Sequence, residues 1–78
     1  MDWKMDQAKR DFQNGLLVGY EIQRAPMSAG RWQVALRTDS TVKGYLVDAR
    51  RKAPRLFATL DAAVSELERI GFRVESMR

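Results

Sequence analysis

Neither cysteine nor histidine occurs among the 78 residues of this chain. Without cysteine there are no disulfides, no thiolate zinc ligands and no cysteine nucleophile. Without histidine the chain lacks the commonest general base and the commonest metal ligand of proteins. The glycines are isolated from one another, so no glycine-rich phosphate loop is recognisable. These absences predict a protein that is not an enzyme and that uses no metal or other cofactor.

Length and hydropathy limit the class of fold. A chain of 78 residues corresponds to one domain, 1–78, and buries only about 60% of its unfolded surface. Its 45% hydrophobic and 31% charged residues are typical of a folded globular protein. The polar N-terminal segment is unlike a secretory leader, and no apolar run approaches the roughly 18 residues of a membrane span. We therefore expect a cytoplasmic domain with no membrane contact, which a homodimer would stabilise further.

Helical spacing is found in the first 14 residues. Apolar residues recur at spacings of four, three and four, which predicts one stripe of a helix; they are Met1, Met5, Ala8 and Phe12. Asn14-Gly15 then predicts the end of that helix. Trp3 falls on roughly the opposite face. We interpret it as folding back on the domain or lying on a frayed first turn, in preference to an exposed contact residue.

A period of two then predicts three strands. The first turns four side chains inward, namely Leu16, Val18, Tyr20 and Ile22. The second turns Trp32, Val34 and Leu36 inward and leaves the alternate side chains outward, namely Arg31, Gln33, Ala35 and Arg37. The third covers about 43–51, with Tyr45 and Val47 interpreted as inward. Ala53-Pro54 should interrupt pairing, because proline has no N–H to donate.

The clearest local pattern is a helix over 60–70. Thr59 is its predicted N-cap, Asp61 complements the helix dipole and Gly71 ends it. Its apolar stripe is Leu60, Ala63, Val64, Leu67 and Ile70. Alternation over 72–77 predicts a short final strand. The expected fold is α+β, an antiparallel three- to four-stranded sheet with one helix packed on a face and an N-terminal helix, in the order α-β-β-β-α-β.

The net charge of +4 is concentrated in the middle of the chain. Residues 1–23 and 57–78 each carry three basic and four acidic residues, whereas residues 24–56 carry eight basic and two acidic ones. The eight are Arg24, Arg31, Arg37, Lys43, Arg50, Arg51, Lys52 and Arg55. Most flank the predicted apolar face or point away from it, so we expect them to gather on one exposed side. Arginine predominates, and its planar fork suits phosphate oxygens and the guanine edge.

The segment from Arg31 to Gly71 runs RWQVALRT, GYLVDARR, RKAPR and FATLDAAVSELERIG in that order. This order resembles the three-stranded-sheet-plus-helix DNA-binding domain of tyrosine integrases that bind arm-type sites, shared with the plant ethylene-response-factor domain. The comparable places are held by Trp32, Phe57, Thr59, Ala62 and Ala63. The RxFxTLDAAxxxLxxIG ending is also similar to short uncharacterised proteins of bacterial plasmids and other mobile elements.

The resemblance implies that the exposed sheet face enters the major groove. It places five side chains within reach of bases or phosphates, namely Arg31, Gln33, Arg37, Arg50 and Arg55. The strand before Trp32 and the strand after Gly71 are additions to the family pattern, and there is room for an added strand on or beside the face that the family uses for DNA.

We therefore predict a non-enzymatic nucleic-acid-binding accessory or regulatory domain. DNA is expected in preference to RNA, which charge alone does not distinguish. The candidate binding residues are Arg24, Arg31, Gln33, Arg37, Lys43, Arg50, Arg51, Lys52 and Arg55. Asp48, which lies among these arginines, is interpreted as an ion-pair partner of Arg50 or Arg37.

Two alternatives stay open at this point. One is a small protein–protein interaction module or inhibitor that docks on an acidic protein surface, with Trp3, Met27 and Met77 as apolar anchors. The other is that the basic residues only keep the domain soluble and discourage strand pairing. An unpaired strand edge would also suit a homodimer or an added peptide strand.

Overall fold

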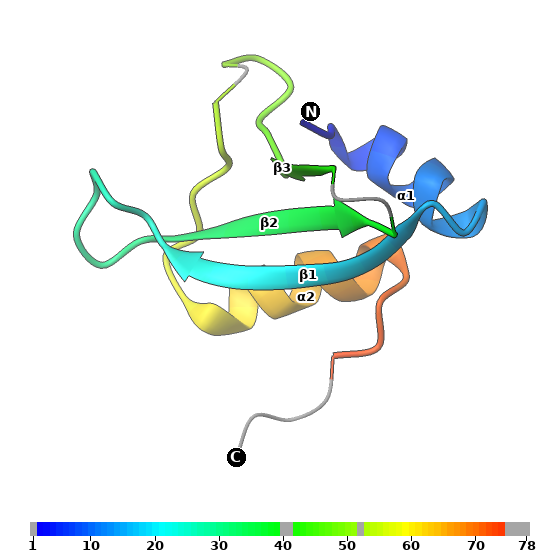
Figure 1. The fold of residues 1–78 in the computed structure, drawn as a ribbon. Coiled ribbons are helices and arrows are strands. Elements are labelled where there is room, and N and C mark those ends of the chain that lie inside the picture. The colour runs from blue at the N-terminus through cyan, green and yellow to red at the C-terminus, as the bar shows by residue number, and fades with distance from the viewer. Residues whose placement is uncertain (1, 40–41, 52, 75–78) are drawn as a thin grey trace.

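Two helices and three strands make up the protein in a computed structural model that describes residues 2–39, 42–51 and 53–74. The elements are α1 (Met5–Gln13), β1 (Leu17–Arg24), β2 (Trp32–Thr38), β3 (Lys43–Tyr45) and α2 (Leu60–Ile70). The strands form one antiparallel sheet in the order β1-β2-β3 (Figure 1). The predicted α+β class is confirmed, with the element order α-β-β-β-α.

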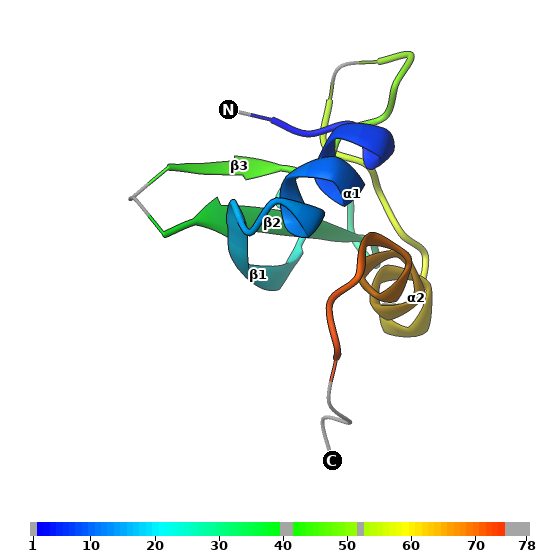
Figure 2. The ribbon, with the colours of Figure 1, turned by 90° about the vertical axis from the view of Figure 1, so that its right-hand side faces the viewer.

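One face of the sheet, the inner face, packs on both helices. Val34 and Leu36 of β2 are buried in a cluster with Ala8 of α1 and with Ala63 and Leu67 of α2. Both helices accordingly lie to the same side of the strands (Figure 2). The inner face therefore carries the hydrophobic core.

The opposite face, the outer face, has no helix against it in the described residues. Directly opposite residues of neighbouring strands project to the same face, so the pairings of β2 with β1 and β3 define it. Its side chains are those of Glu21, Gln23, Gln33, Ala35, Arg37, Lys43 and Tyr45. The predicted inward set of β2, Trp32, Val34 and Leu36, does face the core.

Helix α2 begins and ends where the sequence predicts. The N–H of Ala62 donates to Oγ1 of Thr59 over 3.1 Å, and Gly71 adopts φ 132° after the last turn. Three of the five predicted stripe residues are buried, namely Ala63, Leu67 and Ile70. Leu60 instead remains 38% exposed. Because the N-terminal turn of α2 extends beyond the core, its apolar stripe is covered only from the second turn onward.

The predicted facing of the first part of β1 is wrong. Leu16 and Val18 are 50% and 46% exposed, whereas Leu17 is buried and only 4% exposed. The cause is a register shift between Leu17 and Gly19, which inserts Val18 as an extra residue against β2. Simple alternation holds only beyond this bulge, where Tyr20 and Ile22 pack against the core.

The facing of Tyr45 is also wrong, and β3 is shorter than the predicted 43–51. Tyr45 pairs with Ala35 and so lies on the outer face, while Leu46 is 1% exposed within the core cluster. Val47 is buried, but it forms an isolated bridge with Pro54 outside that cluster. Regular pairing ends here because the chain turns at Asp48, whose N–H donates to the carbonyl of Ala53.

Trp3 folds back on the domain, which confirms the preferred interpretation. Its side chain is fully buried, and its Nε1–H donates to Oδ2 of Asp11 over 2.9 Å. It precedes α1, which begins at Met5; Met1 of the predicted stripe lies outside the described residues. Trp3 is therefore a core residue and is not available as an exposed anchor.

The predicted final strand is not formed over 72–74, and its remaining residues, 75–77, lie outside the described part of the chain. The ring of Phe72 instead packs edge-to-face on Phe12 and Tyr20, with centroids 4.7 Å and 5.2 Å away. These aromatic contacts hold the chain after α2 against the core, so the element order lacks the predicted last strand.

Candidate nucleic-acid interface

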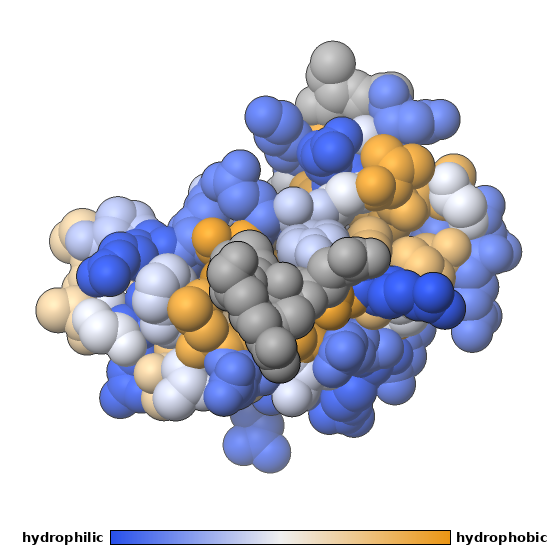
Figure 3. Space-filling model, turned by 90° about the horizontal axis from the view of Figure 1, so that it is seen from below, coloured by the Kyte–Doolittle hydropathy of each residue, from blue (hydrophilic) through white to orange (hydrophobic). Residues whose placement is uncertain are grey.

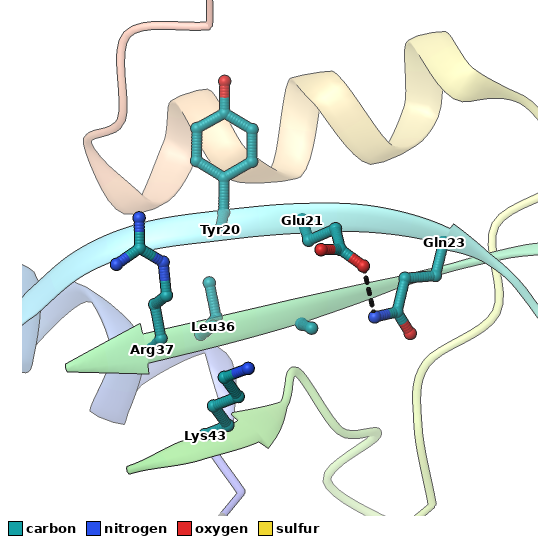
Figure 4. A pocket seen from close by; sticks show the side chains of 7 residues that line it. Tyr20, Glu21, Gln23, Leu36, Arg37 and Lys43 are labelled. Atoms are coloured by element: carbon teal, nitrogen blue, oxygen red, sulfur yellow. Dashed lines mark hydrogen bonds between the residues drawn. The ribbon is translucent and has the colours of Figure 1, made fainter. Parts of the chain in front are cut away.

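Two cations lie side by side on the outer face. Arg37 of β2 pairs with Gly19 of β1 on one side and with Lys43 of β3 on the other. Both charged side chains are exposed, and Figure 4 shows them extending from neighbouring strands. We call Gly19, Arg37 and Lys43 the cationic row.

Gly19 determines how Arg37 lies. A Cβ built on Gly19 would stand 2.6 Å from Nη2 of Arg37 and would also meet Nε and Cζ. The guanidinium therefore lies across the backbone of β1, in space that any other residue at position 19 would fill. The absence of a side chain at one strand position thus places a cation on the neighbouring strand.

A shallow depression of about 200 Å³ adjoins the cationic row on the outer face. Seven residues line it, namely Tyr20, Glu21, Gln23, Ala35, Leu36, Arg37 and Lys43 (Figure 4). Ala35 stands between Glu21 and Tyr45 in the strand pairing, and its single methyl group leaves room above the middle of β2. Tyr20 points away toward α2 in Figure 4, so its ring belongs to the core.

Hydrogen-bonded polar side chains occupy the other end of the outer face. Nε2 of Gln33 donates to Oε1 of Gln23 over 3.2 Å, and Nε2 of Gln23 donates to Oε1 of Glu21 over 2.6 Å (Figure 4). Gln33 lies on the predicted face but is only 7% exposed. Its amide therefore orients Gln23 and is not free to reach a ligand. The face is cationic toward the β2–β3 turn and polar toward the β1–β2 turn.

Two predicted binding arginines are held by contacts on the inner side. Arg24 pairs with Trp32, and its Cζ lies 5.0 Å from the centroid of that ring. Arg55 lies over Phe57 at 5.2 Å and forms a 3.0 Å ion pair with Glu66 of α2. Since these guanidinium groups have aromatic and carboxylate partners within the domain, neither contributes to the outer face.

Glu66 is buried, with only 7% of its surface exposed. One of its carboxylate oxygens binds Arg55, and the other, Oε1, lies 3.0 Å from Nη1 of Arg69. Glu66 is not part of the apolar stripe predicted for α2, so its burial does not follow from the sequence pattern. Its partner Arg55 lies in the irregular segment before α2, and no periodic pattern shows where that segment passes.

The other predicted residues that the structure describes lie apart from the cationic row. Arg31 is exposed just before β2, in the same alternation as Gln33 and Arg37. Arg50 and Arg51 are exposed in a turn after β3, and the loop that carries them projects past β3 on the helix side (Figures 1 and 2). Lys52 lies outside the described residues. Among residues 2–39, 42–51 and 53–74, the predicted cations thus do not gather on one side, contrary to the expectation.

Asp48 caps the turn that carries these arginines. Its Oδ1 accepts a 2.8 Å hydrogen bond from the backbone N–H of Arg50, in place of the predicted side-chain ion pair. This hydrogen bond is the main cause that holds the pKa of Asp48 below its ordinary value; desolvation opposes it, and the N–H of Arg51 and the two arginine charges add to it. Asp48 therefore organises the loop and does not belong to the outer face.

Neither Gly19 nor Tyr45, which both lie on the outer face, was among the predicted binding residues. Both depend on the register across the sheet, because the bulge at Val18 brings Gly19 opposite Arg37. Alternation within a single strand carries no signal for such a bulge. A glycine in a predicted strand is a hint of one, and it is the signal that could have identified Gly19.

No group of three or more carboxylates that could hold a metal ion occurs within residues 2–39, 42–51 and 53–74. No helix in this part of the chain is long and apolar enough to cross a membrane. Comparison with protein-family models, with curated proteins and with solved structures finds no match.

Proposed function

We propose that the protein is a non-enzymatic nucleic-acid-binding domain, with DNA as the preferred partner, and that it binds through the cationic row. The observation that supports this is the direct pairing of Arg37 with Lys43. Like charges at directly opposite positions destabilise a sheet by roughly 0.2–1 kcal/mol. A phosphate close to both side chains would be attracted by both charges, so this part of the outer face suits an anionic partner.

Shape also favours duplex DNA. Neighbouring strands of a sheet lie about 4.8 Å apart, so two of them fit within the major groove of B-DNA, which is about 12 Å wide and admits a two-stranded ribbon. Ala35 leaves the middle of β2 low, and Arg31 extends the positive charge toward the start of the strand. The sheet-and-helix order that resembles the arm-site domain of integrases supports the same mode of binding.

The contacts expected from the cationic row concern mainly the phosphate backbone. Arg37 already lies across Gly19, so little of its conformational freedom remains to be lost on binding. With so few cations on this face, we expect a dissociation constant on the order of 10 μM at moderate salt, within the range of non-specific binding. The setting we propose is an accessory protein of a bacterial plasmid or mobile element, acting in the cytoplasm.

Charge-matched double variants test this proposal. Arg37→Ala with Lys43→Ala removes two positive charges from the outer face, and Arg50→Ala with Arg51→Ala removes two from the loop on the helix side. In anisotropy titrations of a labelled duplex, the first pair should lower the slope of log K against log salt by about 1.8, since each phosphate contact contributes about 0.9. The second pair should change the slope little. Equal losses in both variants would contradict an outer-face site.

Docking on an acidic protein surface is the second candidate, and the exposure of Met27 favours it. Met27 is 93% exposed in the β1–β2 loop, close in sequence to Arg31, so a cation and an apolar anchor are both available there. Poly-glutamate can stand for the acidic partner in the same titrations. Binding of poly-glutamate that exceeds binding of DNA, and that falls in Met27→Ala, would favour this candidate over nucleic acid.

A further inference from the structure

The two edges of the sheet differ in how they are covered. At β3, the N–H of Trp3 donates to the carbonyl of Tyr45 over 2.9 Å, and the N–H of Val47 donates to the carbonyl of Trp3 over 2.8 Å. Oδ1 of Asp2 also accepts from the N–H of Tyr45. The opposite edge is β1, and no residue of the described ranges pairs with its outer side (Figure 1). The N-terminal segment thus covers one edge and leaves the other open.

The register shows which backbone groups of β1 point to this open edge. The N–H of Ala25 donates to the carbonyl of Arg31, so position 25 bonds to the hairpin partner. In an antiparallel pair such bonding alternates, which directs the N–H and C=O groups of Tyr20, Ile22 and Arg24 away from β2. The hydrogen bonds of Trp32 are consistent with this direction. Trp32 lies opposite Arg24, but its N–H and C=O groups bond to Phe57, on the side of β2 away from β1.

The open edge has few of the devices that usually protect edge strands. β1 has eight residues, LVGYEIQR, with no lysine and no proline. Its bulge lies at its N-terminal end, between Leu17 and Gly19, and the rest of the strand pairs regularly. Leu16 and Val18 add exposed apolar surface. Figure 3 shows apolar side chains between hydrophilic ones on the side where β1 and α2 lie. An edge of this kind is suited to pairing with another strand.

We propose that this edge pairs with β1 of a second copy of the chain, antiparallel, about a two-fold axis at Ile22. Tyr20 then lies opposite Arg24 of the partner subunit, and Glu21 lies opposite Gln23 of the partner subunit. Within one chain, Glu21 already accepts a hydrogen bond from Gln23, so the two side chains are complementary. A two-fold axis at Glu21 would instead place that carboxylate against its own copy, which is unfavourable.

Charge supports a second copy as the occupant. The edge carries one carboxylate, Glu21, and one guanidinium, Arg24, so it is neutral, and the two-fold axis at Ile22 brings no like charges opposite each other. Each copy as a whole carries a net charge of +4, which opposes association and is screened by salt. Dimerisation should therefore strengthen as salt rises, whereas binding to nucleic acid should weaken. The inference does not depend on the proposed function.

A proline variant tests the edge. Arg24→Pro removes an N–H that points away from β2 and leaves the β1–β2 ladder bonds in place, whereas Arg24→Ala keeps that N–H. In sedimentation equilibrium between about 10 μM and 1 mM, we expect a reversible wild-type dimer, an alanine variant within about threefold of it, and a proline variant at least tenfold weaker. Circular dichroism checks that both variants are folded.

A wild-type chain that stays monomeric over this range would overturn the proposal, and binding of a foreign strand would then be the remaining use of the edge. Equal dimerisation of the alanine and proline variants would also overturn it, because the dimer would then use another surface.

Cysteine cross-linking tests the register, since the chain contains no cysteine of its own. In the proposed dimer Glu21 and Gln23 of the partner subunit form a non-hydrogen-bonded pair, with Cα atoms about 4.5 Å apart, within the range of a disulfide. A mixture of Glu21→Cys and Gln23→Cys chains should oxidise to the mixed dimer faster than either chain alone. Faster oxidation of either variant by itself would contradict the two-fold axis at Ile22.

Discussion

The inner and outer faces of the three-stranded sheet differ in what they contact: the inner face packs on the helices, and the outer face is exposed. On the inner face Trp3, Val34 and Leu67 are fully buried, and both helices pack against the strands. On the outer face Arg37 and Lys43 are exposed beside a shallow depression. Because stability comes mainly from buried apolar area, the inner face carries the fold, and the outer face can hold charges that suit a partner.

The contacts of the arginine side chains also differ between the two faces. On the inner side Arg24 lies over Trp32 and Arg55 binds Glu66, so neither guanidinium adds to the charge of the outer face. On the outer face Arg37 lies over the backbone of Gly19. Counting cations along the sequence therefore overstates the charge that a partner meets, and the contacts of each guanidinium decide which of them is available.

The largest effect is expected at Trp3. Trp3→Ala removes a fully buried indole and its hydrogen bond to Asp11, and it should lower the free energy of unfolding by about 3–5 kcal/mol in urea denaturation. Arg37→Ala should change it by no more than about 0.5 kcal/mol. Similar losses in the two variants would break the distinction between the faces.

Glu66 gives the next largest effect. Glu66→Ala leaves Arg55 and Arg69 without their shared partner, but these side chains are 41% and 62% exposed and regain water. We expect a loss of about 1–2 kcal/mol in thermal or urea unfolding. Glu68→Ala on the exposed side of α2 is the matched control and should lie within about 0.5 kcal/mol of the wild type. An equal loss at Glu68 would mean that the buried ion pairs add nothing.

Gly19 sharpens the comparison on the outer face. A Cβ at this position displaces the Arg37 guanidinium, so Gly19→Ala should weaken DNA binding by about 0.5–1 kcal/mol, roughly two- to fivefold. The free energy of unfolding should hold or rise, because alanine restricts the unfolded chain more than glycine does. Anisotropy and urea titrations measure the two quantities. Loss of stability with unchanged binding would contradict the role assigned to Gly19.

The smallest effect is expected at Asp48. The folded protein holds the pKa of Asp48 below its ordinary value, chiefly through the N–H of Arg50, so the carboxylate stabilises the turn. That contribution is present above the unfolded pKa and is lost as the pH falls through the folded pKa. Carboxyl titration by NMR should find the lowered value, and Asp48→Asn should leave DNA binding at neutral pH unchanged. A normal pKa would contradict the hydrogen-bonded turn.

Local patterns predicted what is local. The cap at Thr59, the stop at Gly71 and the length of α2 follow from residues near one another in sequence, and the structure confirms them. The inward set of β2 likewise follows from alternation, because no bulge interrupts that strand. Patterns of this kind need no knowledge of what packs against the element.

Features that depend on distant partners could not be predicted. The bulge at Val18 changed the facing of β1, and Phe72 packed on Phe12 and Tyr20 instead of entering a strand. The candidate site shows the same limit, since Arg55 is paired with Glu66 and Gln33 is buried against Gln23. Which cations share a face is a property of register and loop path.

An NMR titration of the ¹⁵N-labelled chain with a short duplex tests most directly whether the outer face is the binding surface. Amide shift changes should concentrate at Gly19, Ala35, Arg37, Lys43 and Tyr45, and should be small in α2 and at Arg50 and Arg51. Changes centred on α2 or on the loop at Arg50, with the amides of the cationic row unmoved, would contradict the account.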